Sequence, residues 1–334
     1  MTTPAAYRTQ LLAEYEAYVR SHVWALEEAT INTLYQEFID AYQRIAAQLL
    51  EVWQRYGLGE TWSATDATYR VRTDYLLSQI SQILYELSSA AEQYVFSASL
   101  TAFEAGMFGR AWVMDGVLRA DAPVIIPLIP MQAIVQAVQA PYMGSTFIDR
   151  FANTRDEFIR LIRQSIVQSQ IEGDGIYKAI KRLAERLGVD IGRRTTAARS
   201  ANAGMFNRIE MIARTEILRS SNLGAMQIYM ENQDVLKGWE WLTSADDRVC
   251  PLCGPLDGKQ FAFNSPMIPP PRHVRCRCTP IPVLIDSALE QAIVGTRQTY
   301  SEWALRNGIT AAQDGGIFGL RGVSAPTSPL TQGA

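Results

Sequence analysis

The sequence predicts a mainly α-helical protein with a small α+β module towards its C-terminus. Residues 7–56 contain no glycine or proline, and apolar residues recur there at helical spacing. A different pattern concerns the cysteines, since all four lie between positions 250 and 278 with one of the two histidines. We therefore expect a long N-terminal helical hairpin, a central helical region, and a zinc-knuckle-like module with a short sheet.

The hairpin is predicted from apolar positions that repeat every three or four residues. In the first helix these positions are Leu34, Phe38, Ala41, Ile45, Leu49 and Val52. Gly57 and Gly59 end that helix, and the second runs from Asp66 to about Met107. Its apolar positions are Leu76, Ile80, Ile83, Leu87, Ala90 and Tyr94. Such alternation is typical of the seam between two packed helices. His22 falls in the same helical run, and we assign it no role.

Proline and glycine divide the chain into four parts. The apolar run 124–129 lies among four prolines and is either an extended buried segment or a docking strip. The composition beyond position 308 is rich in small residues and proline, which is typical of a flexible tail. The predicted parts are a long-helix region (1–119), a proline-rich linker (120–144), a domain with a Cys/His module at 238–285 (145–285), and a helix with a tail (286–334).

Charge is distributed unevenly, although the net charge is only -3. Residues 1–144 hold 8 basic and 15 acidic side chains, whereas residues 145–285 hold 20 basic and 15 acidic ones. Such asymmetry suits a protein with two different neighbours. The N-terminus is polar, and no run approaches the ~18 apolar residues of a membrane span. We therefore expect no signal peptide, no membrane segment, and synthesis in a reducing cytoplasm.

The strongest local charge excess lies between Lys178 and Arg208, with eight basic and two acidic residues. A solvated helix face explains this pattern, and a surface for DNA or an acidic partner is the alternative. Aromatic side chains for base stacking are nearly absent, which argues against sequence-specific reading of DNA. The candidate contact residues are Lys178, Lys181, Arg182, Arg186, Arg193, Arg194 and Arg199.

A helix is predicted from about Asn202 to Asn232, and it carries the polar cluster Arg214, Thr215 and Glu216. Ion pairs at helical spacing on the surface, Glu210 with Arg214 and Glu216 with Arg219, are one interpretation. The other is that the cluster attaches the cysteine module to the helical body. Three strand candidates follow at 238–243, 259–263 and 279–284.

The cysteines predict a metal site. Cys250 and Cys253 are separated by two residues, and so are His273 and Cys276, a spacing that suits a closed tetrahedral zinc site. Four protein ligands leave no position for a substrate water, so the zinc would be structural. Two disulfides or metal-free thiols are the alternatives. The candidate ligands are Cys250, Cys253, His273, Cys276 and Cys278, and the spacing leaves open which of the last two cysteines completes the set.

No constellation in the sequence is typical of an enzyme, since it has neither a Walker loop nor a metalloprotease histidine pair. Asp246, Asp247 and Asp257 suggest a nuclease-like cation site, but aspartate before a turn is ordinarily a cap. A cysteine–histidine hydrolase centred on His273 is a further alternative. Arginines beside the candidate ligands also allow a zinc module that binds DNA without sequence preference, namely Arg272, Arg275 and Arg277. We predict a protein that is not an enzyme.

The order of these motifs resembles the Mu F-like family of phage head morphogenesis proteins, also called minor head proteins. The resemblance covers about residues 145–285 and departs at Val274, where members usually carry proline after the histidine. The residues that carry it are Ala213-Arg214-Thr215-Glu216, an asparagine-containing helix, Trp239-Glu240-Trp241-Leu242, Asp246-Asp247-Arg248, Cys250-Pro251-Leu252-Cys253, Leu256-Asp257-Gly258-Lys259, Pro269-Pro270-Pro271, His273 and Cys276-Arg277-Cys278.

The resemblance implies a structural role in a tailed-phage virion. The partners it implies are the portal protein and other head proteins at the portal vertex, and the process is head morphogenesis, DNA packaging or DNA delivery. Contact with genomic DNA through the basic stretch, and self-association, are further expectations. Some members carry a toxin domain such as an ADP-ribosyltransferase after the shared module, and we expect the roughly fifty residues that follow here to be too few for one.

Overall fold

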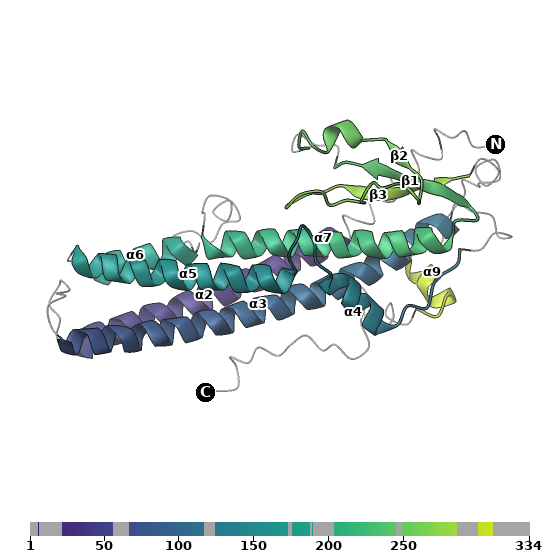
Figure 1. Ribbon diagram of the computed structural model, residues 1–334. Helices are drawn as coiled ribbons and strands as arrows, with labels where there is room; N and C mark the ends of the chain where they lie inside the picture. The colour runs from purple at the N-terminus through teal and green to yellow at the C-terminus, as the bar shows by residue number, and fades with distance from the viewer. Residues whose placement is uncertain are drawn as a thin grey trace. The chain divides into compact units, whose positions relative to one another are not determined.

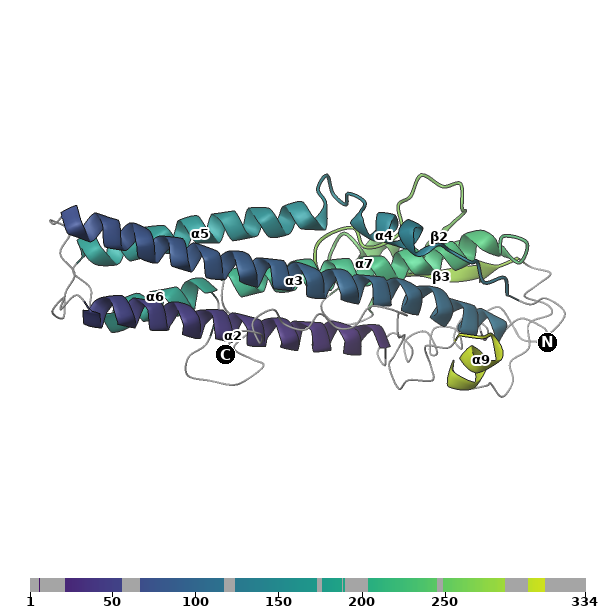
Figure 2. The same cartoon turned by 90° about the horizontal axis from the view of Figure 1, so that it is seen from below.

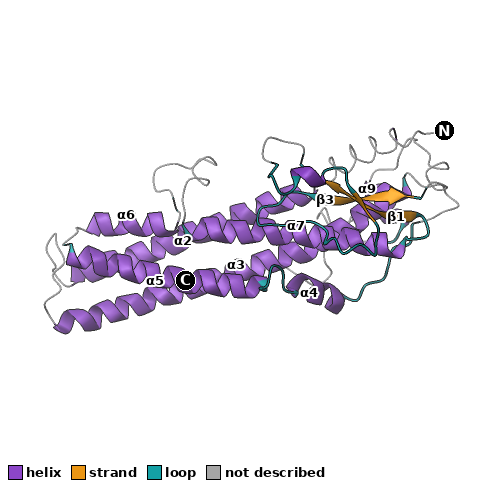
Figure 3. Cartoon of the chain, turned by 45° about the horizontal axis from the view of Figure 1, so that its top comes forward, coloured by secondary structure: helices purple, strands orange, loops and turns teal. Residues whose placement is uncertain are grey.

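A computed structural model places most of the chain, and the fold is mainly helical with one small antiparallel sheet, as predicted (Figure 3). The chain divides into two compact units, the first comprising 1–29, 95–140 and 214–334 and the second 30–94 and 141–213. The residues described are 22–55, 67–116, 124–172, 176–187, 204–244, 249–285 and 300–309, with Ala6 and Val189. The predicted break at Gly57 and Gly59 and the predicted tail beyond Ile309 lie outside them.

The second unit contains the helical hairpin, which we define as residues 30–94 of α2 (Trp24–Arg55) and α3 (Ala67–Asp115). The two helices run antiparallel (Figures 1 and 2). Arg44 pairs with Glu86 at 2.7 Å, and the Tyr94 hydroxyl donates to Glu37 at 3.3 Å. The predicted seam is confirmed, because these apolar side chains are buried: Leu34, Phe38, Ala41, Ile45, Leu49, Leu76, Ile80, Ile83, Leu87 and Ala90.

The second unit also contains α5 (Phe147–Ile171), α6 (Ile176–Leu187) and the start of α7 (Met205–Glu231). A reciprocal cap starts α5: Asp149 N–H donates to Thr146 Oγ1 at 3.1 Å, and Thr146 N–H donates to Asp149 Oδ2 at 3.2 Å. This cap holds the pKa of Asp149 below its ordinary value, chiefly through the Thr146 hydroxyl. Phe158, Ile162 and Ile166 are buried along α5, as the helical pattern predicts.

In the first unit α3 continues past its predicted end near Met107 to Asp115. The helix continues through Gly106, and a second helix lies directly against that position. A Cβ on Gly106 would stand 1.9 Å from the Ser221 carbonyl oxygen, and one on Gly224 would stand 1.9 Å from that of Phe103. The backbones of α3 and α7 therefore touch, and glycine is the residue that permits it.

The segment predicted as a linker contains a helix, α4 (Met131–Gln139), with Ile134 and Val138 buried. Arg219 from α7 donates to the carbonyl oxygens of Val138 and Ala140 at 3.0 Å each. These are helix-end carbonyls that lack intrahelical donors, so the guanidinium satisfies their hydrogen bonds. Its positive charge also interacts favourably with the helix dipole. The preceding apolar run is only half buried, since Leu128 is 100% exposed.

All three strands of the described residues form one sheet, in the order β2-β1-β3. They are β1 (Leu236–Leu242), β2 (Gln260–Phe261) and β3 (Thr279–Leu284), each within or next to a predicted strand. Trp239 of β1 faces Phe261 on one side and Pro282 on the other. Prolines suit β3 because it is an edge strand. The sheet lies over α7 (Figure 1), and Trp239 and Trp241 are buried.

The last described helix, α9 (Tyr300–Arg306), covers the end of the helix predicted at 286–306. The Trp303 indole N–H donates to Asp115 at 3.1 Å, and Arg306 pairs with the same carboxylate at 2.6 Å. None of the helices in the described ranges combines the length and the hydropathy that crossing a bilayer requires.

Candidate metal centre

Two short turns of the first unit bring the candidate ligands together. In the first, the N–H groups of Cys253 and Gly254 donate to the Cys250 carbonyl at 3.1 and 3.0 Å. In the second, the Cys276 N–H donates to the His273 carbonyl at 3.2 Å. Arg275 closes this second turn in the left-handed region, with a φ of 57°. Each two-residue spacing thus forms a turn that directs both of its end side chains to one side.

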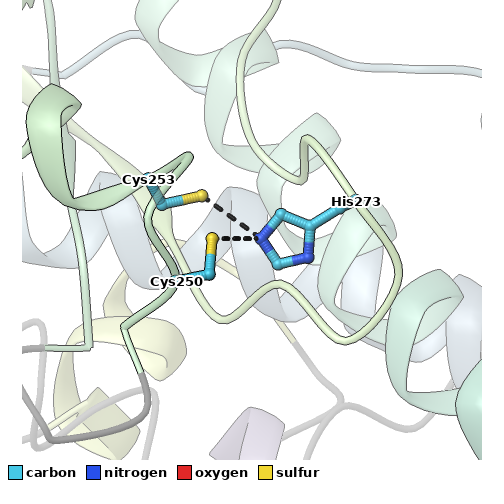
Figure 4. A group of neighbouring side chains, drawn as sticks. All are labelled: Cys250, Cys253 and His273. Atoms are coloured by element: carbon cyan, nitrogen blue, oxygen red, sulfur yellow. Dashed lines mark hydrogen bonds between the residues drawn. The ribbon is translucent and has the colours of Figure 1, made fainter.

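The two turns face each other across the candidate site (Figure 4). His273 Nε2 lies 3.0 Å from Cys250 Sγ and 3.3 Å from Cys253 Sγ. Cys253 Sγ lies 3.8 Å from Cys276 Sγ. The potential ligand atoms fall into two groups within 4.8 Å, one with Cys250, Cys253 and His273 and one with Cys253, Cys276 and Cys278. Cys253 belongs to both groups.

Each of these three separations is close to the value for two ligands of one tetrahedral ion, although Cys276 is not within 4.8 Å of every member of the first group. Zinc bonds of ~2.3 Å to sulfur and ~2.0 Å to nitrogen place two sulfurs ~3.8 Å apart and a sulfur and a nitrogen ~3.5 Å apart. The Cys253–Cys276 separation of 3.8 Å equals the first value, and both separations from His273 are within about half an ångström of the second. None of the four cysteines is in a disulfide, so each sulfur is available to ligate a metal as a thiolate.

The imidazole of His273 is oriented for metal binding. Its Nδ1 lies 2.8 Å from the Val274 carbonyl oxygen, which only accepts hydrogen bonds, so Nδ1 carries the proton. The lone pair of the neutral ring is then on Nε2, the atom that faces the sulfurs. A backbone carbonyl that fixes the other ring nitrogen is the usual support of a metal-ligating histidine. Val274 therefore supplies this support through its backbone carbonyl.

The surroundings lower the pKa of some of the thiols and raise the pKa of others. Burial alone would raise the pKa of Cys250, but N–H groups of Cys253 and Leu252 bring it below its ordinary value. A hydrogen bond from the Cys278 thiol lowers the pKa of Cys276 to about 5. Burial, then the charge of Cys276, raises the pKa of Cys253 to about 12. Several buried thiols therefore cannot ionise together without a compensating cation, and a divalent metal supplies one.

The polar cluster predicted on α7 contacts the module directly. Thr215 Oγ1 accepts a hydrogen bond from the Arg275 N–H at 3.1 Å, inside the second turn. Arg214 pairs with Glu27. Glu216 and Arg219 pair at 3.2 Å, but their side chains are only 1% and 8% exposed. The interpretation of that pair as a surface ion pair is therefore wrong, since α7 lies under the sheet and α4.

The basic candidate residues of α6 are mostly exposed. Lys178, Lys181 and Arg186 are exposed, and Arg182 is half buried and pairs with Glu172 at 2.6 Å. Asp257 accepts from both the backbone N–H and the hydroxyl of Thr243, at 2.9 and 3.0 Å, which is the cap expected before a turn. The remaining candidates lie outside the described residues: Arg193, Arg194, Arg199, Asp246, Asp247 and Arg248.

Sequence reasoning singled out Thr215 but gave no role to the other residues that attach the module to the helices. Asn222 and Ser221 are buried in mid-helix, and Arg110 is 1% exposed on α3. Arg110 donates to Ser221 at 3.3 Å and to the Thr279 hydroxyl at 3.0 Å. The only available signal was a run of polar residues in an otherwise apolar helix, which does not identify their partners.

Comparison with known proteins bears on this site. Residues 160–281 match the family described as Phage Mu protein F like protein. This part of the chain is similar to the Mu F-like family. The match includes every candidate ligand, so the predicted resemblance to this phage head family is confirmed.

One curated relative extends beyond the Mu F-like domain. The chain is 24% identical over 315 residues to the NAD(+)–arginine ADP-ribosyltransferase EFV of Enterococcus faecalis. The alignment spans 87% of this chain but only 59% of that relative. No solved structure matches the chain.

Proposed function

We propose that this protein is a structural minor head protein of a tailed phage whose Mu F-like domain is stabilised by one zinc ion. The observation that carries the proposal is the presence, inside the domain that matches the phage family, of two adjoining groups of potential ligands, Cys250 with Cys253 and His273 and Cys253 with Cys276 and Cys278, which share Cys253. The site is closed by protein ligands and packed against buried tryptophans, so the ion has no open position for catalysis. Its binding free energy contributes to folding of the module instead.

The proposed ligands are Cys250, Cys253, His273 and Cys276. Cys276 is preferred to Cys278 because its sulfur lies 3.8 Å from Cys253 Sγ, the separation of two sulfurs bound to one zinc ion. Cys278 instead donates a hydrogen bond from its thiol to Cys276. Three sulfurs and one imidazole favour zinc over harder divalent cations such as Mg²⁺ or Ca²⁺.

The proposed place of the protein is the portal vertex of the virion, with the portal protein and other head proteins as partners. The family supports this place, and the acidic N-terminal and basic central parts suit two different neighbours. Roles in DNA packaging or delivery follow from that place. DNA contact would use the exposed lysines of α6, Lys178 and Lys181, and self-association of the hairpin is a further proposal.

We also propose that the chain acts without enzymatic activity. The ADP-ribosyltransferase named above is matched over 59% of its length, and its activity is a property of that whole protein. Incubation of the full chain with NAD⁺ and an arginine-containing acceptor is therefore expected to transfer no ADP-ribose. Transfer above the level of a heat-inactivated sample would overturn this part of the proposal.

Metal content tests the structural part. Purified full chain is expected to contain one zinc ion per molecule by elemental analysis, and chelation is expected to lower its melting temperature. Restoration of the melting temperature by Zn²⁺ but not by Mg²⁺ is the matched control. A fully reduced protein that carries no metal and melts at the same temperature with or without chelator would remove the zinc from the proposal.

Location in the particle tests the assembly part. Chemical cross-linking of intact virions, followed by mass spectrometry, is expected to join this protein to the portal protein. Cross-links to the major capsid protein throughout the shell, with none to the portal, would contradict the vertex location. Particles from a phage that lacks this gene serve as the control for the peptide assignment.

A further inference from the structure

The segment that carries His273 and Cys276, which we call the ligand loop (residues 270–279), is held at both ends by one side chain. Asn222 Nδ2 donates to the carbonyl oxygens of Pro270 and Cys278 at 3.1 and 3.0 Å. Its Oδ1 accepts from the Thr279 hydroxyl at 2.9 Å. The Asn222 side chain is 1% exposed. Both donor protons and the acceptor of this amide are thus used on the ligand loop.

A second residue of α7 holds the middle of the ligand loop. Thr215 Oγ1 accepts the backbone N–H of Arg275 at 3.1 Å, and Thr215 is fully buried. Thr215 precedes Asn222 by two helical turns, which places both side chains on the same face of α7. Arg275 has a φ of 57°, a conformation that residues other than glycine rarely adopt without support. The Thr215 contact supplies that support at the residue before Cys276.

Two further contacts hold the chain where the ligand loop continues into β3. Arg110 donates to the Thr279 hydroxyl at 3.0 Å, and the Tyr229 hydroxyl donates to the Pro280 carbonyl at 3.2 Å. None of these contacts involves a candidate ligand side chain. They therefore fix the loop through its backbone and the Thr279 hydroxyl, and leave the sulfurs and the imidazole directed at the site.

We propose that Asn222 and Thr215 are positioning residues that preset the His273–Cys276 half of the metal site on α7 before the ion binds. This inference rests on the proposed zinc site. Ordering a loop costs backbone entropy, and a loop already ordered by α7 does not subtract that cost from metal binding. Groups outside the ligand shell that hold ligands in place change metal affinity by about ten- to a hundred-fold when they are removed.

The chain offers a matched control for Asn222. Asn232, just past the end of the same helix, is also 1% exposed. It likewise makes three hydrogen bonds, to the N–H and C=O of Ile125 and to the Ile228 carbonyl, at 2.8 to 2.9 Å. Asn222→Ala and Asn232→Ala thus remove the same chemistry at the same burial, but only the first removes it from the ligand loop.

The first test measures the Zn²⁺ affinity of the full chain by competition with a chromophoric chelator. Asn222→Ala is expected to weaken Zn²⁺ binding by about ten-fold or more, while Asn232→Ala stays within about two-fold of the unmodified protein. Both variants are expected to lower the melting temperature. Equal affinity of Asn222→Ala and the unmodified protein, or equal weakening in both variants, would overturn the proposal.

A second pair of variants serves where Asn222→Ala fails to fold. Thr215→Val keeps the shape of the side chain but removes its acceptor, whereas Thr215→Ser keeps the hydroxyl. In metal-free protein, hydrogen exchange of the Arg275 amide is expected to accelerate in Thr215→Val and to remain slow in Thr215→Ser. Fast exchange at Arg275 in the metal-free unmodified protein would overturn the presetting.

The two proposals fail in different ways. If the unmodified chain binds no Zn²⁺, the zinc site is wrong, and slow exchange of the Arg275 amide still reports whether α7 orders the loop. If it binds Zn²⁺ and all four variants bind it equally, the zinc site stands and the positioning role of α7 is wrong. Co²⁺ in place of Zn²⁺ adds a spectroscopic check, because the tetrahedral absorption bands are expected to weaken or shift in Asn222→Ala and not in Asn232→Ala.

Discussion

The helical hairpin and the segment of α7 from Thr215 to Asn222 are both buried, but they bury different kinds of side chain. In the hairpin the buried side chains of the seam are leucine, isoleucine, phenylalanine and alanine. On α7 the buried side chains between positions 215 and 222 include six polar ones, all under 9% exposed: Thr215, Glu216, Arg219, Ser220, Ser221 and Asn222. The first region is held by area removed from water, whereas five of these six α7 residues have specific hydrogen-bond partners and the buried Ser220 hydroxyl has none in the described part of the chain.

This difference determines how each region responds to change. Apolar burial is non-directional, so loss of one methyl group weakens the hairpin in proportion to the area and volume removed. A buried polar group needs its partner, and removal of the partner leaves a desolvated group unsatisfied. We therefore expect substitutions in the hairpin to reduce stability in a graded way. Substitutions of the α7 residues that hold the module are expected to affect the metal site specifically.

The largest effect is expected from Cys253, because both groups of potential ligands contain it. Cys253→Ser is expected to reduce bound zinc from one ion per chain to nearly none, and to destabilise the module by several kcal/mol. Cys278→Ser, at a similarly buried thiol outside the proposed ligand set, is expected to retain the ion. Elemental analysis and thermal melts measure both. Retention of zinc by the Cys253 variant, with loss in the Cys278 variant, would reverse the ligand assignment.

In the hairpin the expected effect is smaller and follows burial. Leu34 is fully buried and Leu50 is 37% exposed on the same helix. Leu34→Ala is expected to cost about 2–5 kcal/mol of unfolding free energy, and Leu50→Ala about 1 kcal/mol or less. Chemical denaturation measures both, and neither variant is expected to change zinc content. Similar costs for the two leucines would show that the seam is not the source of hairpin stability.

The substitution Gly106→Ala is expected to change stability in the direction opposite to that given by helix propensity. In an exposed helix interior Gly→Ala stabilises by up to about 1 kcal/mol. Here the added Cβ would lie 1.9 Å from the Ser221 carbonyl, so Gly106→Ala is expected to destabilise by about 1–3 kcal/mol through forced separation of α3 and α7. Gly254→Ala is the control, since its Cβ would meet only Val249 Cγ1 at 3.8 Å. A gain in melting temperature for the Gly106 variant would contradict the close approach.

The smallest effect concerns Glu104 and depends on pH. Burial raises the pKa of Glu104 from 4.5 to about 7. Because the folded-state pKa lies above the unfolded one, the folded protein binds more protons between about pH 4.5 and 7, and this contribution to stability is lost as pH rises through that window. Burial, and then the charge of Glu104, also raise the pKa of the neighbouring Tyr300.

Glu104→Gln removes this titration. The stability of the unmodified protein relative to the variant is expected to fall by on the order of 1 kcal/mol from pH 4.5 to 7.5, allowing for solvent screening of a partly exposed carboxyl. Denaturation at several pH values measures the difference, in which other titrating groups cancel. Parallel stability curves for the two proteins would show that the carboxyl titrates normally.

Much of the fold and part of the site were predictable for one reason. The hairpin seam, the helix at α7 and the three strands follow from patterns within one element, where side-chain spacing reports burial directly. The two turns with cysteine and histidine at their ends are also local. The helix α4 was not predicted. The carbonyl groups at its C-terminal end receive hydrogen bonds from Arg219, which is about eighty residues away in the sequence.

The sequence by itself determined most of the helices and strands, α4 excepted, and which side chains are suited to bind a metal, because these depend on neighbours a few residues apart. Only the tertiary structure decided the partners of Asn222, the close crossing at Gly106, and the burial of Glu216 with Arg219. Each of these is settled by a group from a distant segment, as when Arg110 reaches Thr279 across 169 positions. A directional bond or a backbone contact of this kind leaves no periodic trace in the sequence, whereas apolar burial does.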